Sequence, residues 1–375
     1  MNNFLSVVWY RVLPADYGGQ KGIAEFNDHL GRKVPLTCLC SRNNSPNNDL
    51  SYQLLPELPV SRLQFLNPFA RQHIRSLIRQ QSFSHIIIEH PYHAWLGKYK
   101  KKLGFVFIVH AHNIEHLRMK ARGKTWWPLI KMIERKAFHA ADHILFKTEA
   151  DKQNAISLFN IDPAKCRIVP YGIKETSQPV VPAAEKDAFR KKHNVGRDEK
   201  VIVFAGTLTY EPNVEALTSI AQHIIPLLQK KGFAFRLFIC GALPGKKLAE
   251  LNAIPGVTAT GFVSSLQEFL QAADVFINPV TSGSGIQTKN IEAIANGCTV
   301  VTTNFAATGL PGYLLNQKLW VSPDNDWQSF TSNIIKAGGQ ANKTPVAFYE
   351  DYHWQHIIER LLPQIGIATG KTVRR

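Results

Sequence analysis

Short runs of apolar and β-branched residues alternate along the chain with longer segments in which apolar residues recur every three or four positions. The short runs occupy residues 4–9, 36–40, 85–89, 105–109, 141–146, 201–205, 235–240, 273–277 and 298–302. Such runs are typical of buried strands, and the longer segments, for example residues 68–81, are typical of helices. The alternation predicts an α/β fold with parallel sheets that helices cover on both faces. Ligands of such sheets bind at the carboxyl ends of the strands, where we therefore expect the functional residues.

The chain length and the breaks in this pattern predict two α/β domains. At 375 residues the chain exceeds the roughly 250–300 residues at which a single core stops growing. We expect a first domain over residues 1–172, a linker over 173–200 and a second domain over 201–345, followed by a helix and tail over 346–375. No apolar run reaches the roughly 18 residues that a membrane span needs. The first residues have the pattern of a core strand rather than of a signal peptide.

A loop rich in Gly and Ser leads into a predicted helix in residues 280–301, between two of the predicted strands. The loop contains Gly285, apolar residues then recur at helical spacing, and Gly297 has the position of a helix C′ glycine. The unpaired amides and the dipole of a helix N-terminus suit a phosphate or diphosphate. Lys289 can neutralise phosphate charge, and Glu292, three residues further on the same helix face, can accept hydrogen bonds from sugar hydroxyls. The pattern fits a nucleotide-sugar site, and it also fits an ordinary turn with solvated polar residues.

The same stretch resembles the donor site of a known family. Residues 283–297, which read G-S-G-I-Q-T-K-N-I-E-A-I-A-N-G, are similar to the donor-site signature of GT-B glycosyltransferases of the GT4 type. The resemblance implies two facing Rossmann-like domains with parallel sheets and a central cleft, and a C-terminal helix that crosses back to the first domain. It also implies that Glu292 binds the donor ribose and that Lys289 lies near the donor phosphates. Many members carry a glutamate that contacts the donor sugar where this chain has Ser284.

Other positions match the donor site of this family. The loop after residues 201–205 reads G-T-L-T-Y-E-P-N and is similar to a variant in the family, but Thr207 and Pro212 stand where members often carry Arg and Lys. Lys289 and backbone amides would therefore carry more of the diphosphate charge. The resemblance implies donor contacts at Gly18, Gly19, Gly206, Thr207, Phe262, Val263, Ser284, Gly285, Ile286, Lys289 and Glu292. Of these, the amides of the glycine pair, which we expect in a loop that precedes a helix, and the helix N-terminus at residues 284–286 would face the diphosphate.

A histidine-rich segment follows the predicted strand at residues 105–109. It reads H-A-H-N-I-E-H from His110 to His116, and its histidines and glutamate resemble a metal cluster. No Asp or Cys set completes a tetrahedral zinc site, so we expect no metal here. The family resemblance implies instead that His112, or in second place His110, reaches the transferred sugar. A polar helix start capped by Asn113 or His112 is the alternative interpretation.

The formal net charge of +16 indicates an anionic partner, which can be membrane lipid, nucleic acid or a phosphorylated substrate. Residues 118–136 combine seven basic residues with two adjacent tryptophans. This mixture suits a peripheral contact with an anionic membrane, and aromatic residues among cations also suit nucleic acid. It equally fits a helix whose Leu129, Ile130 and Ile133 face the core. We expect no nucleic-acid partner, because such a partner leaves the loop in residues 280–301 unexplained.

The resemblance and the residue pattern together predict a hexosyltransferase-like enzyme. It would move a sugar from a UDP- or GDP-linked donor to a hydroxyl of a glycan or lipid-linked acceptor, in polysaccharide or glycolipid biosynthesis. The resemblance implies retention of configuration without a metal or other cofactor, and catalytic roles for His112, Lys289 and Glu292. The five cysteines are odd in number and at least three of them lie in apolar strand-like runs, which favours reduced thiols in a cytoplasmic protein, free or peripheral on the inner face of a membrane. Two alternatives stay open: a catalytically silent nucleotide-sugar-binding module, and a sugar-nucleotide epimerase, which needs a pair of acid/base carboxylates.

Overall fold

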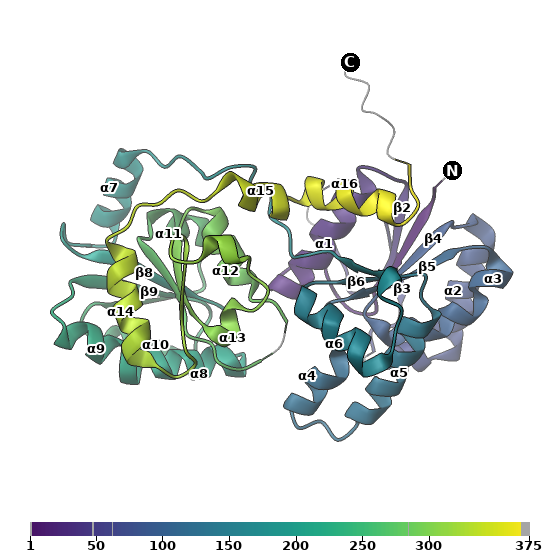
Figure 1. Cartoon of the computed structure of the whole chain (residues 1–375), viewed down its shortest axis with the longest axis horizontal. Helices are drawn as coiled ribbons and strands as arrows, with labels where there is room; N and C mark the ends of the chain where they lie inside the picture. The colour runs from purple at the N-terminus through teal and green to yellow at the C-terminus, as the bar shows by residue number, and fades with distance from the viewer. Residues whose placement is uncertain (1, 47–48, 62, 284, 369–375) are drawn as a thin grey trace, which may run out of the picture. The chain divides into compact units, whose positions relative to one another are not determined.

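The computed structural model describes residues 2–46, 49–61, 63–283 and 285–368. The chain forms two compact units, of which the first consists of Met1–Gly172 with Tyr352–Arg375 and the second of Ile173–Asp351. Each unit contains one parallel β-sheet flanked by helices (Figure 1). The prediction of an α/β fold with two Rossmann-like sheets is therefore confirmed.

The first unit contains a seven-stranded sheet in the order β3-β2-β1-β4-β5-β6-β7. Its strands are β1 (Phe4–Val7), β2 (Leu36–Ser41), β3 (Gln53–Leu58), β4 (His85–Glu89), β5 (Val106–Ala111), β6 (His143–Phe146) and β7 (Cys166–Ile168). The sequence pattern does not predict β3, which reads Q-L-L-P-E-L and is largely open to solvent. It lies at the edge of the sheet and contains Pro56, and an edge strand tolerates both features because one of its sides forms no ladder.

Both faces of this sheet are buried, which explains why its central strands read as continuous apolar runs. In β4, Ile86 and Ile88 belong to one core cluster, whereas Ile87 belongs to the cluster on the opposite face. The helices around the sheet are α1 (Gly18–Gly31), α2 (Pro68–Gln81), α3 (Lys100–Leu103), α4 (Glu115–Ala121), α5 (Trp127–Ala140), α6 (Glu149–Phe159) and α16 (Trp354–Gln364). Short 3-10 segments are η1 (Gln64–Leu66), η2 (Pro91–Tyr99) and η3 (Pro163–Lys165).

The C-terminal segment of the chain contributes to the core of the first unit. Trp354 and Ile357 of α16 are buried in the same cluster as Ile23 and Phe26 of α1. The single helix expected near the C-terminus is instead two helices, α15 (Val346–Tyr352) and α16, with an extended residue, His353, between them.

The second unit contains a six-stranded sheet in the order β10-β9-β8-β11-β12-β13. Its strands are β8 (Lys200–Ala205), β9 (Phe235–Cys240), β10 (Val257–Gly261), β11 (Val275–Asn278), β12 (Thr299–Thr303) and β13 (Leu319–Ser322). Its helices are α7 (Ala183–Lys192), α8 (Glu211–Ser219), the π-helix η4 (Ile220–Ile224), α9 (Ile225–Lys230), α10 (Gly245–Asn252), α11 (Leu266–Ala272), α12 (Thr288–Ala295), α13 (Asn304–Ala307), the 3-10 segment η5 (Gly312–Leu314) and α14 (Trp327–Gly338). Phe189 of α7 packs edge-on against Phe238 and Phe269. The segment expected as a linker therefore contributes an apolar side chain to this unit.

None of the helices in the described part of the chain is both long enough and apolar enough to cross a lipid bilayer.

Candidate active site

In the first unit, the histidine-rich segment lies at the carboxyl end of β5, beside the carboxyl end of β4. Glu89, the last residue of β4, pairs with His110 across these two parallel strands. Lys147 follows directly after β6, the next strand in the sheet. The fold thus gathers a carboxylate, two imidazoles and an ammonium group at the sheet edge where parallel α/β sheets bind their ligands.

The Glu89 carboxylate accepts hydrogen bonds from two imidazoles. Its Oε2 lies 2.6 Å from His112 Nε2, and its Oε1 lies 3.2 Å from His110 Nδ1. The side chains of Glu89 and His110 are completely buried, whereas 11% of the His112 side chain is exposed. Of these three residues, His112 is therefore the one that can touch a ligand.

Burial keeps both imidazoles neutral near pH 7. It lowers the pKa of His110 well below its ordinary value, and the charge of Lys147 lowers it further. Burial and then the His110 ring lower the pKa of His112 in the same direction, against the hydrogen bond to Glu89, which raises it. Burial also lowers the pKa of Lys147 to about 8, although Glu89 acts to raise it. The buried Lys147 Nζ has no hydrogen-bond partner among the residues that the structure describes.

A second buried carboxylate, Glu115 at the start of α4, lies beside this group. It accepts hydrogen bonds from His90 Nδ1 at 3.1 Å, from the Tyr92 hydroxyl at 3.1 Å and from the Arg118 guanidinium at 2.7 Å. Burial raises the pKa of Glu115, but the hydrogen bonds and charges of His90 and Arg118 prevail and hold it at about 2. The His90 ring centroid lies 4.6 Å from that of His112. Glu115 therefore fixes one wall of the space in which His112 lies.

The distances within the group formed by Glu89, His110 and His112 can be compared with those of a metal-binding site. Their candidate ligand atoms all lie within 4.8 Å of one another, which is the spacing of a possible metal-binding set. Two tetrahedral zinc ligands with bonds of about 2.0–2.1 Å stand roughly 3.3 Å apart. The 2.6 Å between Glu89 Oε2 and His112 Nε2 is shorter than this and has the length of a charge-assisted hydrogen bond. As they lie, these side chains form a hydrogen-bonded group, and the pair would have to move apart to hold an ion.

In the second unit, the predicted anion-binding loop follows β11 and leads into α12. The helix begins at Thr288 after the N-cap Gln287, so the prediction of a helix N-terminus at residues 284–286 is wrong by several residues. Gly285 has a φ of +74°, a left-handed conformation that favours glycine and continues the loop. Ile286 precedes the helix and is half-buried, and Ser284 lies outside the described residues. The free amides of the helix therefore start at its first turn, around Thr288.

Lys289 is the basic residue of this first turn, and its ammonium group is withdrawn from solvent. Its Nζ donates a hydrogen bond to Asn213 Oδ1 at 2.7 Å and lies 5.0 Å from the centroid of the Phe204 ring. Burial lowers the pKa of Lys289 to about 7. Asn213 in turn donates from Nδ2 to the carbonyl oxygen of Thr207 at 3.0 Å. Asn213 thus joins the loop after β8 to α12.

Asn213 is a residue of the candidate site that the sequence pattern did not predict. It lies in the segment G-T-L-T-Y-E-P-N, in which Thr207 and Pro212 stand where related proteins often carry basic residues. The half-buried Gly206 lies against the same contact. A Cβ at Gly206 would lie 2.8 Å from Asn213 Nδ2 and 3.3 Å from Lys289 Nζ. A side chain at this position would therefore disturb the lysine.

The remaining predicted donor residues of the second unit lie at the carboxyl edge of its sheet. Gly206 and the exposed Thr207 follow β8, and Phe262 and Val263 follow β10. The Phe262 ring is 83% exposed, an open position for a large apolar side chain. Glu292 lies on α12 one turn beyond Lys289 and is half-buried.

The predicted glycine pair of the first unit does not form a loop. Gly18 and Gly19 are the first two residues of α1, and the expectation that they precede the helix is wrong. Their N-cap, Tyr17, makes no side-chain capping bond. Their amides thus belong to a helix N-terminus, where amides have no partner within the helix.

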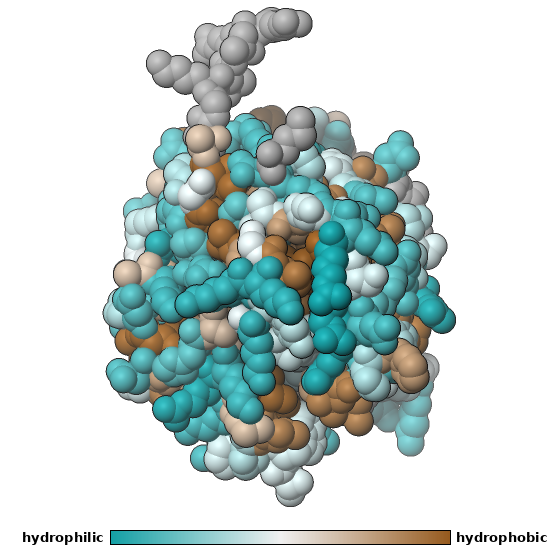
Figure 2. All heavy atoms as spheres, turned by 90° about the vertical axis from the view of Figure 1, so that its right-hand side faces the viewer, coloured by the Kyte–Doolittle hydropathy of each residue, from teal (hydrophilic) through white to brown (hydrophobic). Residues whose placement is uncertain are grey.

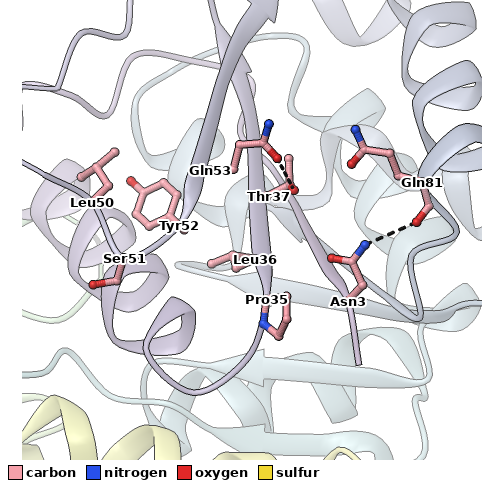
Figure 3. Close-up of a pocket in the computed structure, with 9 residues that line it drawn as sticks. All are labelled: Asn3, Pro35, Leu36, Thr37, Leu50, Ser51, Tyr52, Gln53 and Gln81. Atoms are coloured by element: carbon pink, nitrogen blue, oxygen red, sulfur yellow. Dashed lines mark hydrogen bonds between the residues drawn. The ribbon is translucent and has the colours of Figure 1, made fainter. Parts of the chain in front are cut away.

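A surface hollow of 440 Å³ lies at the amino ends of strands of the first sheet, on the side opposite the candidate site (Figure 3). It is lined by Asn3, Pro35, Leu36, Thr37, Leu50, Ser51, Tyr52, Gln53 and Gln81. These residues surround the amino ends of β1, β2 and β3. The side chains of Thr37 and Gln53 bond each other there, as do Asn3 and the carbonyl of Gln81. The hollow contains none of the predicted site residues.

The basic segment of residues 118–136 forms most of α4, the turn after it and the first part of α5. Ile130 is buried, but Trp126, Leu129 and Met132 are between 46% and 48% exposed. The interpretation in which Leu129 faces the core is therefore wrong, while Ile130 does face it. Figure 2 shows that apolar patches lie among hydrophilic side chains on the side of the first unit that carries α2 and α3.

Comparison with known proteins identifies matches for both halves of the chain. A family model described as Glycosyltransferase Family 4 matches residues 18–176, and one described as Glycosyl transferases group 1 matches residues 199–338. An uncharacterized glycosyltransferase of Methanocaldococcus jannaschii is 26% identical over 265 residues, which cover 62% of this chain and 64% of that protein. The match thus spans slightly less than two thirds of this relative.

Solved structures share the fold over nearly the whole chain. Sucrose-phosphate synthase from Thermosynechococcus elongatus superposes with a TM-score of 0.72 at 14% identity, covering 96% of this chain and 97% of that one. HepE of Anabaena, solved in complex with UDP, superposes with a TM-score of 0.71 at 12% identity, covering 97% and 99%. At such identities the likeness concerns the fold alone. The family matches and this shared fold lead to one conclusion: the chain belongs to the GT4-like glycosyltransferases of the GT-B fold.

Proposed function

We propose that this chain transfers a sugar from a nucleotide-sugar donor to a hydroxyl group of a glycan or lipid-linked acceptor. The observation that carries the proposal is the withdrawn ammonium of Lys289 at the first turn of α12, beside a glycine-containing loop at the carboxyl edge of the sheet. A lysine next to free helix amides is suited to a diphosphate. Membership of the GT4-like family supports a donor whose leaving group is such a diphosphate.

The residues divide the work of binding and leaving-group stabilisation. Lys289 and the amides at the start of α12 stabilise the charge that develops on the departing diphosphate. Glu292, one turn further along, accepts hydrogen bonds from the ribose hydroxyls, and the open Phe262 and the backbone at Val263 lie beside the base. His112 contacts the transferred sugar. No metal is needed in this scheme, and the sugar is transferred with retention of configuration.

The donor nucleotide is UDP or GDP in this proposal, and UDP is the first to test. HepE, whose fold resembles that of this chain, was solved with UDP. The acceptor belongs to a surface polysaccharide or a glycolipid. The five cysteines are free and buried, which supports a reducing, cytoplasmic environment.

A thermal-shift measurement with UDP, GDP, ADP and CMP and their sugars tests the donor site. A ligand that binds only the folded protein, at a free concentration of about 100 times its Kd, raises the free energy of unfolding by about 2.7 kcal/mol. We expect one nucleotide to stabilise the wild type. We also expect Lys289→Met to weaken the binding of that nucleotide by about tenfold or more, because the substitution removes a buried charge opposite the diphosphate. Lys230→Met, which removes a lysine from the last turn of α9, is the matched control and should bind as the wild type does.

Turnover separates this proposal from its alternatives. A silent binding module would show nucleotide stabilisation without release of the nucleotide from any sugar donor. An epimerase would convert the sugar of the donor and leave it attached to the nucleotide. Release of nucleotide with transfer of the sugar in its original anomeric configuration, unchanged by a chelator, is the result we expect. Absence of stabilisation by every nucleotide would refute the donor site itself.

We further propose that residues 118–136 bring the enzyme to an anionic membrane surface from the cytoplasmic side. The exposed Trp126, Leu129 and Met132 lie among seven basic residues in this segment. Apolar side chains of this kind insert at the level of the lipid headgroups, while cations attract anionic lipid. Such docking fits an acceptor that is linked to lipid.

A further inference from the structure

The site at the end of β5 contains an unusual arrangement, in which one buried carboxylate binds two imidazoles. Glu89 Oε2 is 2.6 Å from His112 Nε2, and Glu89 Oε1 is 3.2 Å from His110 Nδ1. Among the residues that the structure describes, the hydrogen bond to Glu89 is the only one that the His112 side chain makes. The orientation of His112 thus depends on Glu89 and on the rings around it.

Those rings restrict the movement of His112. Its ring centroid lies 4.3 Å from that of His110 and 4.6 Å from that of His90. His110 is held by Glu89, and His90 is held by Glu115. The imidazole therefore has little freedom to turn over, a movement that would place a carbon where each of its nitrogens now lies.

Hydrogen-bond chemistry then decides which nitrogen of His112 carries the proton. A carboxylate can only accept, so Nε2 of His112 must donate its N–H to Glu89. In a neutral imidazole one nitrogen donates and the other accepts. The remaining nitrogen, Nδ1, therefore presents a lone pair, and it belongs to the one side chain of the three that reaches solvent.

We propose that Glu89 is a positioning residue that holds His112 as the Nε2–H tautomer, so that its Nδ1 accepts a hydrogen bond from a hydroxyl of the bound sugar or acceptor. The identity of this ligand rests on the proposed glycosyltransferase function, whereas the tautomer does not. The same arrangement selects for a group that donates a hydrogen bond, such as a hydroxyl, over one that can only accept.

Nitrogen NMR of the full chain labelled with ¹⁵N-histidine measures the tautomer directly, because protonated and lone-pair nitrogens resonate in separate regions. The chain has 14 histidines, and His112→Gln and His110→Gln assign the two of interest. We expect His112 near pH 7 to show a protonated Nε2 and an unprotonated Nδ1. A proton on Nδ1, or on both nitrogens, would overturn the proposal without any reference to activity.

Glu89→Gln tests whether the carboxylate sets this state. A glutamine accepts with its oxygen but donates with its amide nitrogen, so it cannot accept from both imidazoles. We expect the His112 nitrogen signals to change and kcat/KM to fall about tenfold, the equivalent of one lost hydrogen bond to substrate. The matched control is Glu57→Gln, because Glu57 bonds His73 at 2.7 Å on the exposed surface. This control should leave the His112 signals and turnover unchanged.

Other results of these experiments also support or overturn the proposed role of Glu89. Retention of both the wild-type tautomer and full turnover in Glu89→Gln would overturn a positioning role. Stoichiometric Zn²⁺ binding that shifts the His112 signals and disappears in Glu89→Gln would overturn it too, because the group would then be a metal site. If Glu89→Gln does not fold, the wild-type spectrum alone decides the tautomer. If NMR shows the expected tautomer but the protein transfers no sugar, the role of Glu89 is supported and the proposed function is refuted.

Discussion

At the scale of single residues, the second unit holds the ammonium group of Lys289 in a buried position. Asn213 and the ring of Phe204 hold the Lys289 ammonium away from solvent, and burial lowers its pKa to about 7. An anion that binds beside it favours the charged form and so raises its pKa again. Binding of a diphosphate should therefore be coupled to uptake of a proton.

This coupling predicts a pH dependence of donor binding. Below about pH 7 Lys289 is already charged in the free protein, so its contribution to affinity is fully present there. Above that pH the free lysine is neutral, and the affinity should fall progressively as pH rises towards about 9, because a proton must be taken up. Calorimetric titration with a nucleotide sugar, whose diphosphate diester does not titrate in this range, measures both the affinity and the proton uptake.

Lys289→Met provides the comparison for this titration. Its weaker binding should vary little with pH over the same range, because the titrating group is gone. A wild-type affinity that is flat from about pH 7 to about pH 9 would contradict the lowered pKa as the origin of the effect.

At the scale of elements, α4 and α5 form one structural piece that joins the candidate site to the basic surface. The buried carboxylate of Glu134 on α5 accepts hydrogen bonds from the backbone amides of Glu115 and His116 at the start of α4, and from His116 Nδ1 at 2.6 Å. It thus takes the place of an N-cap side chain, which α4 lacks. Glu115, in the same turn, holds His90 beside His112. The exposed side chains of α5 therefore belong to an element anchored at the site.

Vesicle sedimentation tests the proposed binding of this element to a membrane. We expect the protein to bind vesicles that contain anionic lipid, and this binding to weaken as salt screens the basic residues. The double variant Trp126→Ser with Leu129→Ser should bind about tenfold more weakly or worse, because each removes an apolar side chain that would enter the interface. Val180→Ser is the matched control, since Val180 is 94% exposed and lies outside the segment. Equal binding to purely zwitterionic vesicles would argue against this surface.

At the scale of the whole molecule, the chain builds its first unit from both of its ends. Residues 352–375 belong with the N-terminal residues, and Trp354 packs there against Phe26, His29 and Tyr171. A Cβ at Gly172 would lie 2.2 Å from the Trp354 ring, so this glycine is required by close packing. The core of the first unit is thus complete only when α16 is in place.

This packing predicts a large loss of stability for Trp354→Ala. Trp354 is almost fully buried, and removal of a buried tryptophan side chain costs about 3–5 kcal/mol through lost burial and the cavity that remains. Denaturant unfolding followed by circular dichroism should show the loss. Trp126→Ala changes the same residue type where it is 46% exposed and should alter the free energy of unfolding by less than about 0.5 kcal/mol. Equal effects of the two substitutions would refute the role assigned to α16.

The sequence pattern by itself determines the alternation of strands and helices and the division into two α/β units. It does so because strands buried on both faces need continuous apolar runs, and such a run marks β4, β5, β8 and β9. It does not determine β3, β7 or β13, which lie at edges of the two sheets, where such a run is not needed. The sequence pattern also does not determine that the helix starts at Thr288, because apolar residues of the preceding loop and of the helix follow the same spacing.

Only the tertiary structure decides which side chains meet. Glu89 and His112 are 23 positions apart, and Lys289 and Asn213 are 76 apart, so neither pair forms a sequence motif. The order of the strands brings the ends of β4 and β5 together, and the adjacency of β8 and β11 brings the loop after β8 to α12. The protonation states follow from the same contacts, since burial and a partner set a pKa and a tautomer, and both depend on the packed chain. The sequence thus supplied the reactive groups, and the fold decided how each is held.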